Sequence, residues 1–285
     1  MEEGRPSRTA FGVARRRAAH QLIDQPPLVL DDPVAVPILG PDAAAEIKAN
    51  LQKYDSLPGR GLRAFMAARS RYAEDQLHQA IIRGVRQYVI LGAGLDTFPY
   101  RNPYPPEQLK IFEVDHPATQ QWKLELLARA NINIPSELTF APVNFEQQTL
   151  ATGLTQTSFD FQHPAFFSWL GVTPYLTLEA FRATIRTIGN MPSGSGVTFE
   201  YALSRSLLKE HEKLGFDRLA MRVEAAGEPF QLFFSPEQMK AELATAGFYQ
   251  VEELTSDRIN DRYFQDRSDG LRLYGGLARL ITAWM

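Results

Sequence analysis

The chain has 285 residues, of which 44% are apolar, and it carries a formal net charge of −3. This length and composition suit one α/β domain with additions, and the charge gives no general attraction to nucleic acid. Because the chain has no cysteine, disulfides, thiolate chemistry and zinc–thiolate sites are excluded. No apolar run reaches membrane-spanning length, and the first six residues lack the apolar core of a signal peptide. We therefore expect a cytoplasmic protein that binds neither nucleic acid nor membrane.

The first 84 residues are predicted to be helical. Pro26-Pro27 ends the first helix, Asp42 is placed to cap the second, and Pro58-Gly59 is expected to break the chain before the long third one. The basic run Arg15–Arg17 is typical of a solvated helix face. The predicted helices cover residues 8–22, 43–52 and 61–84, with a short helical region after Asp31-Asp32-Pro33.

Beyond residue 84, predicted strands alternate with helices. They cover residues 87–91, 110–115, 138–143, 165–172, 196–202, 249–254 and 275–283. Strands that are apolar almost throughout, such as Tyr88–Leu91, are typical of a sheet covered on both faces. The alternation predicts a doubly wound, mainly parallel α/β sheet. The long helical segment before it provides either extra core or a cap over the active site.

A glycine turn follows the first predicted strand directly. Gly92 and Gly94 end the strand, and two acids, Glu113 and Asp115, lie 21 and 23 residues after Gly92. A strand, a glycine turn and an acid about 20 residues on are how α/β sheets hold a nucleoside. Strand alternation puts both acids on one face, and whichever lies at the strand's carboxyl end is expected to bind ribose hydroxyls.

A dinucleotide fingerprint would need a third glycine three residues after Gly94, where this chain has Thr97. Its absence disfavours a pyrophosphate cradle. A nucleoside cofactor without phosphates does not require that glycine. An NAD(P)-dependent oxidoreductase on the same kind of sheet remains the main alternative.

The exact residues of two segments are more specific than the glycine pair. Gly92-Ala-Gly-Leu-Asp-Thr97 followed by Tyr100-Arg101, and then Phe112-Glu-Val-Asp-His-Pro117, resembles the leucine carboxyl methyltransferase-like family of S-adenosylmethionine (SAM)-dependent O-methyltransferases. The resemblance implies SAM as the cofactor, which has no phosphates. That family includes bacterial polyketide O-methyltransferases. The resemblance implies a Rossmann-like sheet of seven strands with the last antiparallel. It also implies a helical cap with the first sheet-covering helix over 1–84, and a SAM-binding core over 85–285, within one structural domain.

Arg69 lies inside the apolar stripe of the predicted helix 61–84, beside Phe65 and Tyr72 at helical spacing. Arg71 points to the opposite side and is expected to be solvated. A guanidinium turned toward a core needs an anion. That anion is either one of the protein's own carboxylates or a ligand's. The resemblance favours the carboxylate of SAM.

The resemblance also implies contacts along the two motifs. It assigns the ribose contact to Asp115, with Glu113 second, and Ala93 and Asp96 are expected to line the cofactor. A cap on the turn at His116-Pro117 is the structural alternative for the acid.

Two positions depart from the family pattern. Asn144-Phe145 stands where the family has an Asp-Leu pair, and amide and ring can still hold the adenine. Leu170 stands where the family often has glutamate. Trp169 is either a substitute contact to the sulfonium or a core residue.

No metal constellation or serine-hydrolase elbow appears. Methyl transfer from SAM chiefly needs positioning and an aligned nucleophile. We therefore predict O-methyl transfer to a carboxylate or hydroxyl of a small-molecule acceptor. A carboxylate needs no general base, whereas for a hydroxyl the unranked candidates are His163, Tyr175 and Tyr201. A non-catalytic methyltransferase-like interaction module is a further alternative.

Overall fold

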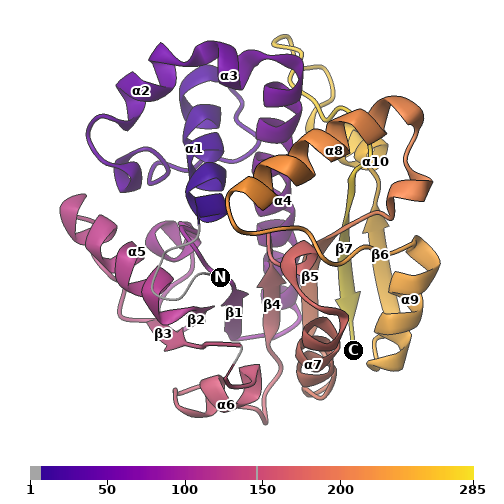
Figure 1. The fold of residues 1–285 in the computed structure, drawn as a ribbon. Helices are drawn as coiled ribbons and strands as arrows, with labels where there is room; N and C mark the ends of the chain where they lie inside the picture. The colour runs from indigo at the N-terminus through magenta and orange to yellow at the C-terminus, as the bar shows by residue number, and fades with distance from the viewer. Residues whose placement is uncertain (1–7, 146) are drawn as a thin grey trace.

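The computed structural model describes residues 8–145 and 147–285, which form an α/β sandwich with a helical layer at one end (Figure 1). The first residues, on which the expectation of no signal peptide rests, lie outside this part. Within the described residues, no helix is long and apolar enough to cross a membrane.

A seven-stranded sheet forms the centre of the molecule, in the order β3-β2-β1-β4-β5-β7-β6. β7 runs antiparallel to both of its neighbours, β5 and β6, while the other pairs are parallel. This confirms the predicted doubly wound, mainly parallel sheet with its last strand antiparallel. The strands are β1 Gln87–Leu91, β2 Lys110–Asp115, β3 Leu138–Pro142, β4 Phe166–Trp169, β5 Gly196–Ala202, β6 Gln250–Leu254 and β7 Ala278–Trp284.

Both faces of the sheet are covered, as the apolar strands predict. Tyr88 and Ile90 of β1 pack under helix α4, and Val89 and Leu91 pack on the opposite face. On the first face lie α4 (Leu57–Ile82), α5 (Pro117–Arg129) and α10 (Ser256–Tyr263), and on the second lie α6 (Leu150–Thr155), α7 (Leu178–Gly189) and α9 (Pro236–Thr245).

The remaining helices gather at the end of the sheet where the parallel strands finish (Figure 1). They are α1 (Arg8–Ile23), α2 (Ala43–Ala49), α3 (Leu51–Asp55) and α8 (Glu210–Ala225), with 3-10 turns η1 (Pro37–Leu39), η2 (Phe98–Arg101), η3 (Thr173–Tyr175) and η4 (Arg205–Leu207). Ala10 of α1 lies against Gly94, because a Cβ added to that glycine would come within 3.2 Å of the Ala10 Cβ. The first helix therefore lies directly over the glycine turn.

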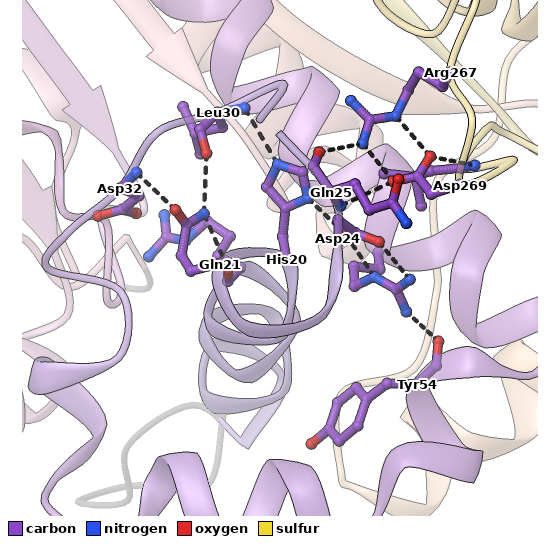
Figure 2. A network of polar contacts seen from close by, with 12 residues as sticks. His20, Gln21, Asp24, Gln25, Leu30, Asp32, Tyr54, Arg267 and Asp269 are labelled. Carbon is purple, nitrogen blue, oxygen red and sulfur yellow. Dashed lines mark hydrogen bonds and ion pairs between the residues drawn. The ribbon is translucent and has the colours of Figure 1, made fainter. Parts of the chain in front are cut away.

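A network of polar groups, buried at His20 and Arg63 and exposed at Gln25, fastens α1 to the body of the protein (Figure 2). Asp24, just after α1, accepts hydrogen bonds from His20 Nδ1 at 2.7 Å and from Arg63 of α4 at 2.7 and 2.8 Å. Gln25 bonds in turn to Asp269, and its carbonyl accepts from Arg267. The cap is thus tied both to α4 and to the segment before β7.

Two helix boundaries differ from the prediction. Helix α4 begins at Leu57, because Ser56 caps it and Pro58 lies in the first turn, where a missing N–H is tolerated. The segment predicted as one helix over 43–52 is divided at Asn50, and the Asp42 side chain makes no capping hydrogen bond.

The expected solvated face of α1 is also wrong in part. Arg17 is only 4% exposed and donates to the carbonyl of Leu95 in the glycine turn. Arg15 bonds to Glu46 at 2.8 Å on the outer side. In the run Arg15–Arg17, one side chain therefore points to solvent and another into the interior.

Candidate functional site

The glycine turn joins β1 to η2 with left-handed backbone at both glycines, φ being +62° at Gly92 and +49° at Gly94. A Cβ at Gly92 would lie 2.3 Å from Val172 Cγ2, so any side chain there would displace the turn after β4. In a nucleoside site such a glycine lets the backbone approach the ligand. The structure shows that it also permits two turns of the protein to pack together.

The turn leads into a short 3-10 segment instead of a long helix. In dinucleotide enzymes a helix N-terminus at this point binds the pyrophosphate. Here η2 has four residues, and Thr97 donates to Asp32 at 2.6 Å. The described structure thus offers no phosphate-binding helix at this point, in agreement with the absent third glycine.

Asp115 ends β2 beside the glycine turn. One carboxylate oxygen accepts from the Gly94 amide at 2.5 Å, and the other accepts from the His116 amide at 2.6 Å. Burial raises the pKa of Asp115. Its bond to His116 matches the capping alternative, yet each oxygen keeps a second lone pair for a hydroxyl donor.

Glu113 shares the face of Asp115 but lies deeper. It is fully buried, and its Oε1 lies 2.6 Å from Lys123 Nζ of α5. Burial raises the pKa of Glu113 to about 7, against the opposing effect of Lys123. Asp115, 9% exposed and beside the glycine turn, is therefore the more accessible of the two acids.

Arg69 and Arg71 lie as the helix pattern predicts. Arg71 is 49% exposed at its side chain and pairs with Asp75. Arg69 is buried, and its Nη1 lies 2.5 Å from Glu200 Oε1 at the carboxyl end of β5. The anion that Arg69 contacts in the structure is therefore one of the protein's own carboxylates. Arg69 makes no other hydrogen bond within the described residues.

Asp96 and its neighbours hold the glycine turn to the cap. Asp96 accepts from the Phe98 amide and lies 3.9 Å from Arg17. Arg101 binds Glu74 of α4, and its Nε lies 3.3 Å from Asp32. These contacts give the Asp-Thr and Tyr-Arg part of the motif a structural role.

The remaining expected cofactor residues divide between edge and core. Asn144 and Phe145 follow β3. They lie close to Asp115 in the structure, because the Val143 amide donates a hydrogen bond to the Asp115 carbonyl. Phe145 is exposed and Asn144 half-buried. Leu170 lies half-buried in the turn after β4. Trp169 stacks on Phe181 in the core of the opposite face, which supports its interpretation as a core residue.

Of the three possible bases, Tyr175 is the one whose phenol is neither at the opposite end of the sheet nor bonded to a carboxylate on the opposite face from Glu200. His163 precedes β4 at the opposite end of the sheet and pairs with Asp160, while Tyr201 donates to Glu253. Tyr175 follows β4, and burial raises its pKa to about 12. Its phenol is therefore protonated at neutral pH and acts as a hydrogen-bond donor.

A second face of α1 looks toward the segment that follows α8. Thr9 and Arg16, seven residues apart, share this face, and Thr9 donates to Glu228. Arg16 is half-buried and bonds to the Gly12 carbonyl, and it makes no ion pair with any described residue. Burial and the neighbouring Arg222 lower the pKa of Arg16. An uncompensated cation thus lies under the cap.

Residue patterns alone do not indicate Glu200, Arg16 or Lys123 as site residues. Glu200 carried a usable signal, since it is the one acid in the strand Gly-Val-Thr-Phe-Glu-Tyr-Ala. Among the described residues, no group of three or more metal-ligating side chains could hold a metal ion.

The sheet order, the antiparallel β7 and the glycine turn beside an acid define a methyltransferase-like α/β protein. A model of the family "Leucine carboxyl methyltransferase" matches residues 10–189, and the chain belongs to this family. The resemblance seen in its motifs is thereby confirmed.

Relatives and solved structures agree with this assignment. The chain is 32% identical to YktD of Bacillus subtilis (strain 168) over 96% of both chains. It is 29% identical to Rv3399 of Mycobacterium tuberculosis (strain ATCC 25618 / H37Rv) over 78% of this chain and 64% of that protein. Both are provisionally named as S-adenosyl-L-methionine-dependent methyltransferases. A protein of Thermobifida fusca, provisionally named as a methyltransferase, shares the fold with a TM-score of 0.56 at 14% identity, over 99% of this chain and 96% of that one.

Proposed function

We propose that this chain is a cytoplasmic SAM-dependent O-methyltransferase acting on a carboxylate or hydroxyl of a small molecule. The supporting observation is the pairing of a glycine turn and Asp115 at the carboxyl ends of β1 and β2 with the uncompensated Arg16 under the cap. The first arrangement suits a nucleoside without phosphates, and the second suits an anionic acceptor. The cysteine-free composition suits a reducing compartment.

The proposed cofactor contacts follow the edge of the sheet. Asp115 accepts from the ribose hydroxyls, while Gly92, Ala93 and Gly94 present backbone to the nucleoside. Asn144 and Phe145 lie where the adenine is expected. Arg69 can bind the cofactor's carboxylate, because a guanidinium has five donors and one nitrogen reaches Glu200. Asp96, Glu113 and Trp169 contact other protein side chains next to these residues, and we propose that they hold the site in place.

SAM supplies an activated methyl group, so the protein chiefly has to position the acceptor. A carboxylate acceptor is ionised already and needs no base. Arg16 would fix it by charge, and the protonated Tyr175 could donate a hydrogen bond. A carboxylate is therefore the acceptor that these residues favour over a hydroxyl.

The two alternatives have less support. A dinucleotide oxidoreductase would need the phosphate-binding helix that the described structure does not offer after Gly94. A non-catalytic module would not require Arg16, a half-buried cation near Arg69 that makes no ion pair with any described residue.

The chemistry of the product tests the proposal. The protein is incubated with methyl-labelled SAM and sets of small carboxylic acids and phenols, and labelled products are treated with mild base. A methyl ester releases labelled methanol and a methyl ether does not. Label that stays on nitrogen or carbon would contradict O-methyl transfer.

Arg16 provides a matched pair of variants. Arg16→Met should raise the KM for a carboxylate acceptor at least tenfold, corresponding to about 1.4 kcal/mol, and leave S-adenosylhomocysteine affinity unchanged. Arg15→Met, whose side chain pairs with Glu46 outside, should alter neither. Equal KM values for the two variants would argue against an anionic acceptor at Arg16.

A further inference from the structure

Glu200 is a buried carboxylate whose two oxygens have very different environments. Glu200 lies near the carboxyl end of β5 with its side chain on the α4 face, and it is 3% exposed. Oε1 accepts from Arg69 at 2.5 Å and from the Gly171 amide at 2.6 Å. Oε2 is buried and has no hydrogen-bond partner within the described structure. A buried carboxyl oxygen without a hydrogen-bond donor is costly inside a protein, so a donor from outside the chain is expected.

The surroundings of Glu200 place that donor at the cofactor edge. The Arg69 guanidinium lies against Gly171, since a Cβ there would be 3.0 Å from Arg69 Nη2. The next residue, Val172, packs on Gly92 of the glycine turn. The Arg69–Glu200 pair is therefore separated from the proposed nucleoside edge by one short turn.

We propose that Glu200 binds the α-ammonium group of the amino-acid part of the cofactor through Oε2, while Arg69 binds its α-carboxylate. This inference rests on the proposed function, since it concerns the same ligand. The ammonium supplies the donor that Oε2 lacks, and the carboxylate meets the Arg69 nitrogens that Glu200 does not use.

Charge balance favours this arrangement over two isolated contacts. Arg69 and Glu200 are neutral as a pair, and an amino-acid end carrying both charges is also neutral. Burying one pair against the other leaves no uncompensated charge. An amine without a carboxylate, or a carboxylate without an amine, would unbalance the site.

A series of four ligands tests the proposal by calorimetry on the full chain. The ligands are S-adenosylhomocysteine, its analogue without the amino group, its analogue without the carboxylate, and 5′-methylthioadenosine, which lacks both. Wild-type protein should bind the analogue without the amino group about 10- to 100-fold more weakly than S-adenosylhomocysteine, as expected for a charge-assisted hydrogen bond.

Variants should reproduce the ligand series from the protein side. Glu200→Gln should bind S-adenosylhomocysteine as weakly as wild type binds the analogue without the amino group, and should bind that analogue unchanged. Arg69→Met should behave likewise toward the carboxylate. Glu252→Gln and Arg71→Met, whose side chains contact α4 residues away from this edge, should bind all four ligands as wild type does.

Three results would overturn the proposal. Equal wild-type affinity for S-adenosylhomocysteine and the analogue without the amino group would make the pair purely structural, and so would a uniform loss with all four ligands in Glu200→Gln. If Glu200→Gln does not fold, the wild-type ligand series still decides. Failure of wild type to bind any of the four, 5′-methylthioadenosine included, would instead reject the proposed function itself.

Discussion

Glu113 and Lys123 form a buried ion pair between β2 and α5, at 2.6 Å and with neither side chain more than 1% exposed. Removing one partner of such a pair leaves an uncompensated charge, whereas the intact pair contributes little net stability. Glu113 Oε2 has no hydrogen-bond partner among the described residues. The acid is thus only partly compensated, and its protonation should influence stability near neutral pH.

The pH dependence of unfolding tests this. Burial raises the pKa of folded Glu113 from its usual 4.5 to about 7, so between these values the folded protein holds more protons than the unfolded chain. This stabilisation is present below about pH 4.5 and is lost as pH rises through about 7. In wild type the free energy of unfolding should fall by an amount on the order of 3 kcal/mol between pH 4.5 and 7 because of Glu113. Glu113→Gln should lack this fall when denaturant unfolding is measured at several pH values. An identical slope in wild type and variant would show that Glu113 stays ionised throughout.

At the scale of secondary structure, the position of α1 over the glycine turn depends on the network at its carboxyl end (Figure 2). Asp24 and Arg63 are both at most 3% exposed at their side chains. His20 donates from Nδ1 to Asp24, while its Nε2 accepts from the Leu30 amide at 3.3 Å. The network therefore fixes the end of the helix and the loop after it.

Breaking this network should destabilise the protein. Arg63→Met leaves Asp24 with a buried charge and should lower the free energy of unfolding by about 3–5 kcal/mol. The control is Arg60→Met on the same helix, whose partner Asp55 is exposed and whose loss should cost at most about 1 kcal/mol. Comparable losses in denaturant unfolding would mean that the network does not hold the cap.

The elements themselves could be predicted from sequence more readily than their ends. Each apolar strand was recognisable, but β4 ends at Trp169 because the chain turns at Gly171 with φ +76°. Helix α4 starts earlier than Pro58-Gly59 suggested, because a proline in a first turn is compatible with a helix. Such boundaries depend on local capping, which residue patterns indicate only weakly.

At the scale of the whole molecule, the candidate site joins segments that are distant in sequence. α1 provides Arg16, α4 provides Arg69, β1 and β2 provide the glycine turn and Asp115, and β5 provides Glu200. The helical spacing of apolar residues correctly predicts that Arg69 points inward and Arg71 outward. It could not show that Glu200 is the inward partner, because that contact spans 131 residues and depends on the sheet order.

The orientation of side chains in the cap also depends on how distant elements pack together. The run Arg15–Arg17 looks like a solvated face when the helix is considered alone. In the folded molecule Arg17 reaches the glycine turn, and Arg16 lies near Arg222 of α8. Only the packing of α1 over the sheet distinguishes the three side chains.

We propose that the glycine turn and Asp115 hold SAM and not a dinucleotide. Calorimetric titration of wild type and Asp115→Ala with S-adenosylhomocysteine and with NAD tests it most directly. Wild type should bind S-adenosylhomocysteine and not NAD, and Asp115→Ala should lose about 1.5–3 kcal/mol of binding free energy. Binding of NAD without S-adenosylhomocysteine, or equal S-adenosylhomocysteine affinity in both proteins, would contradict the account.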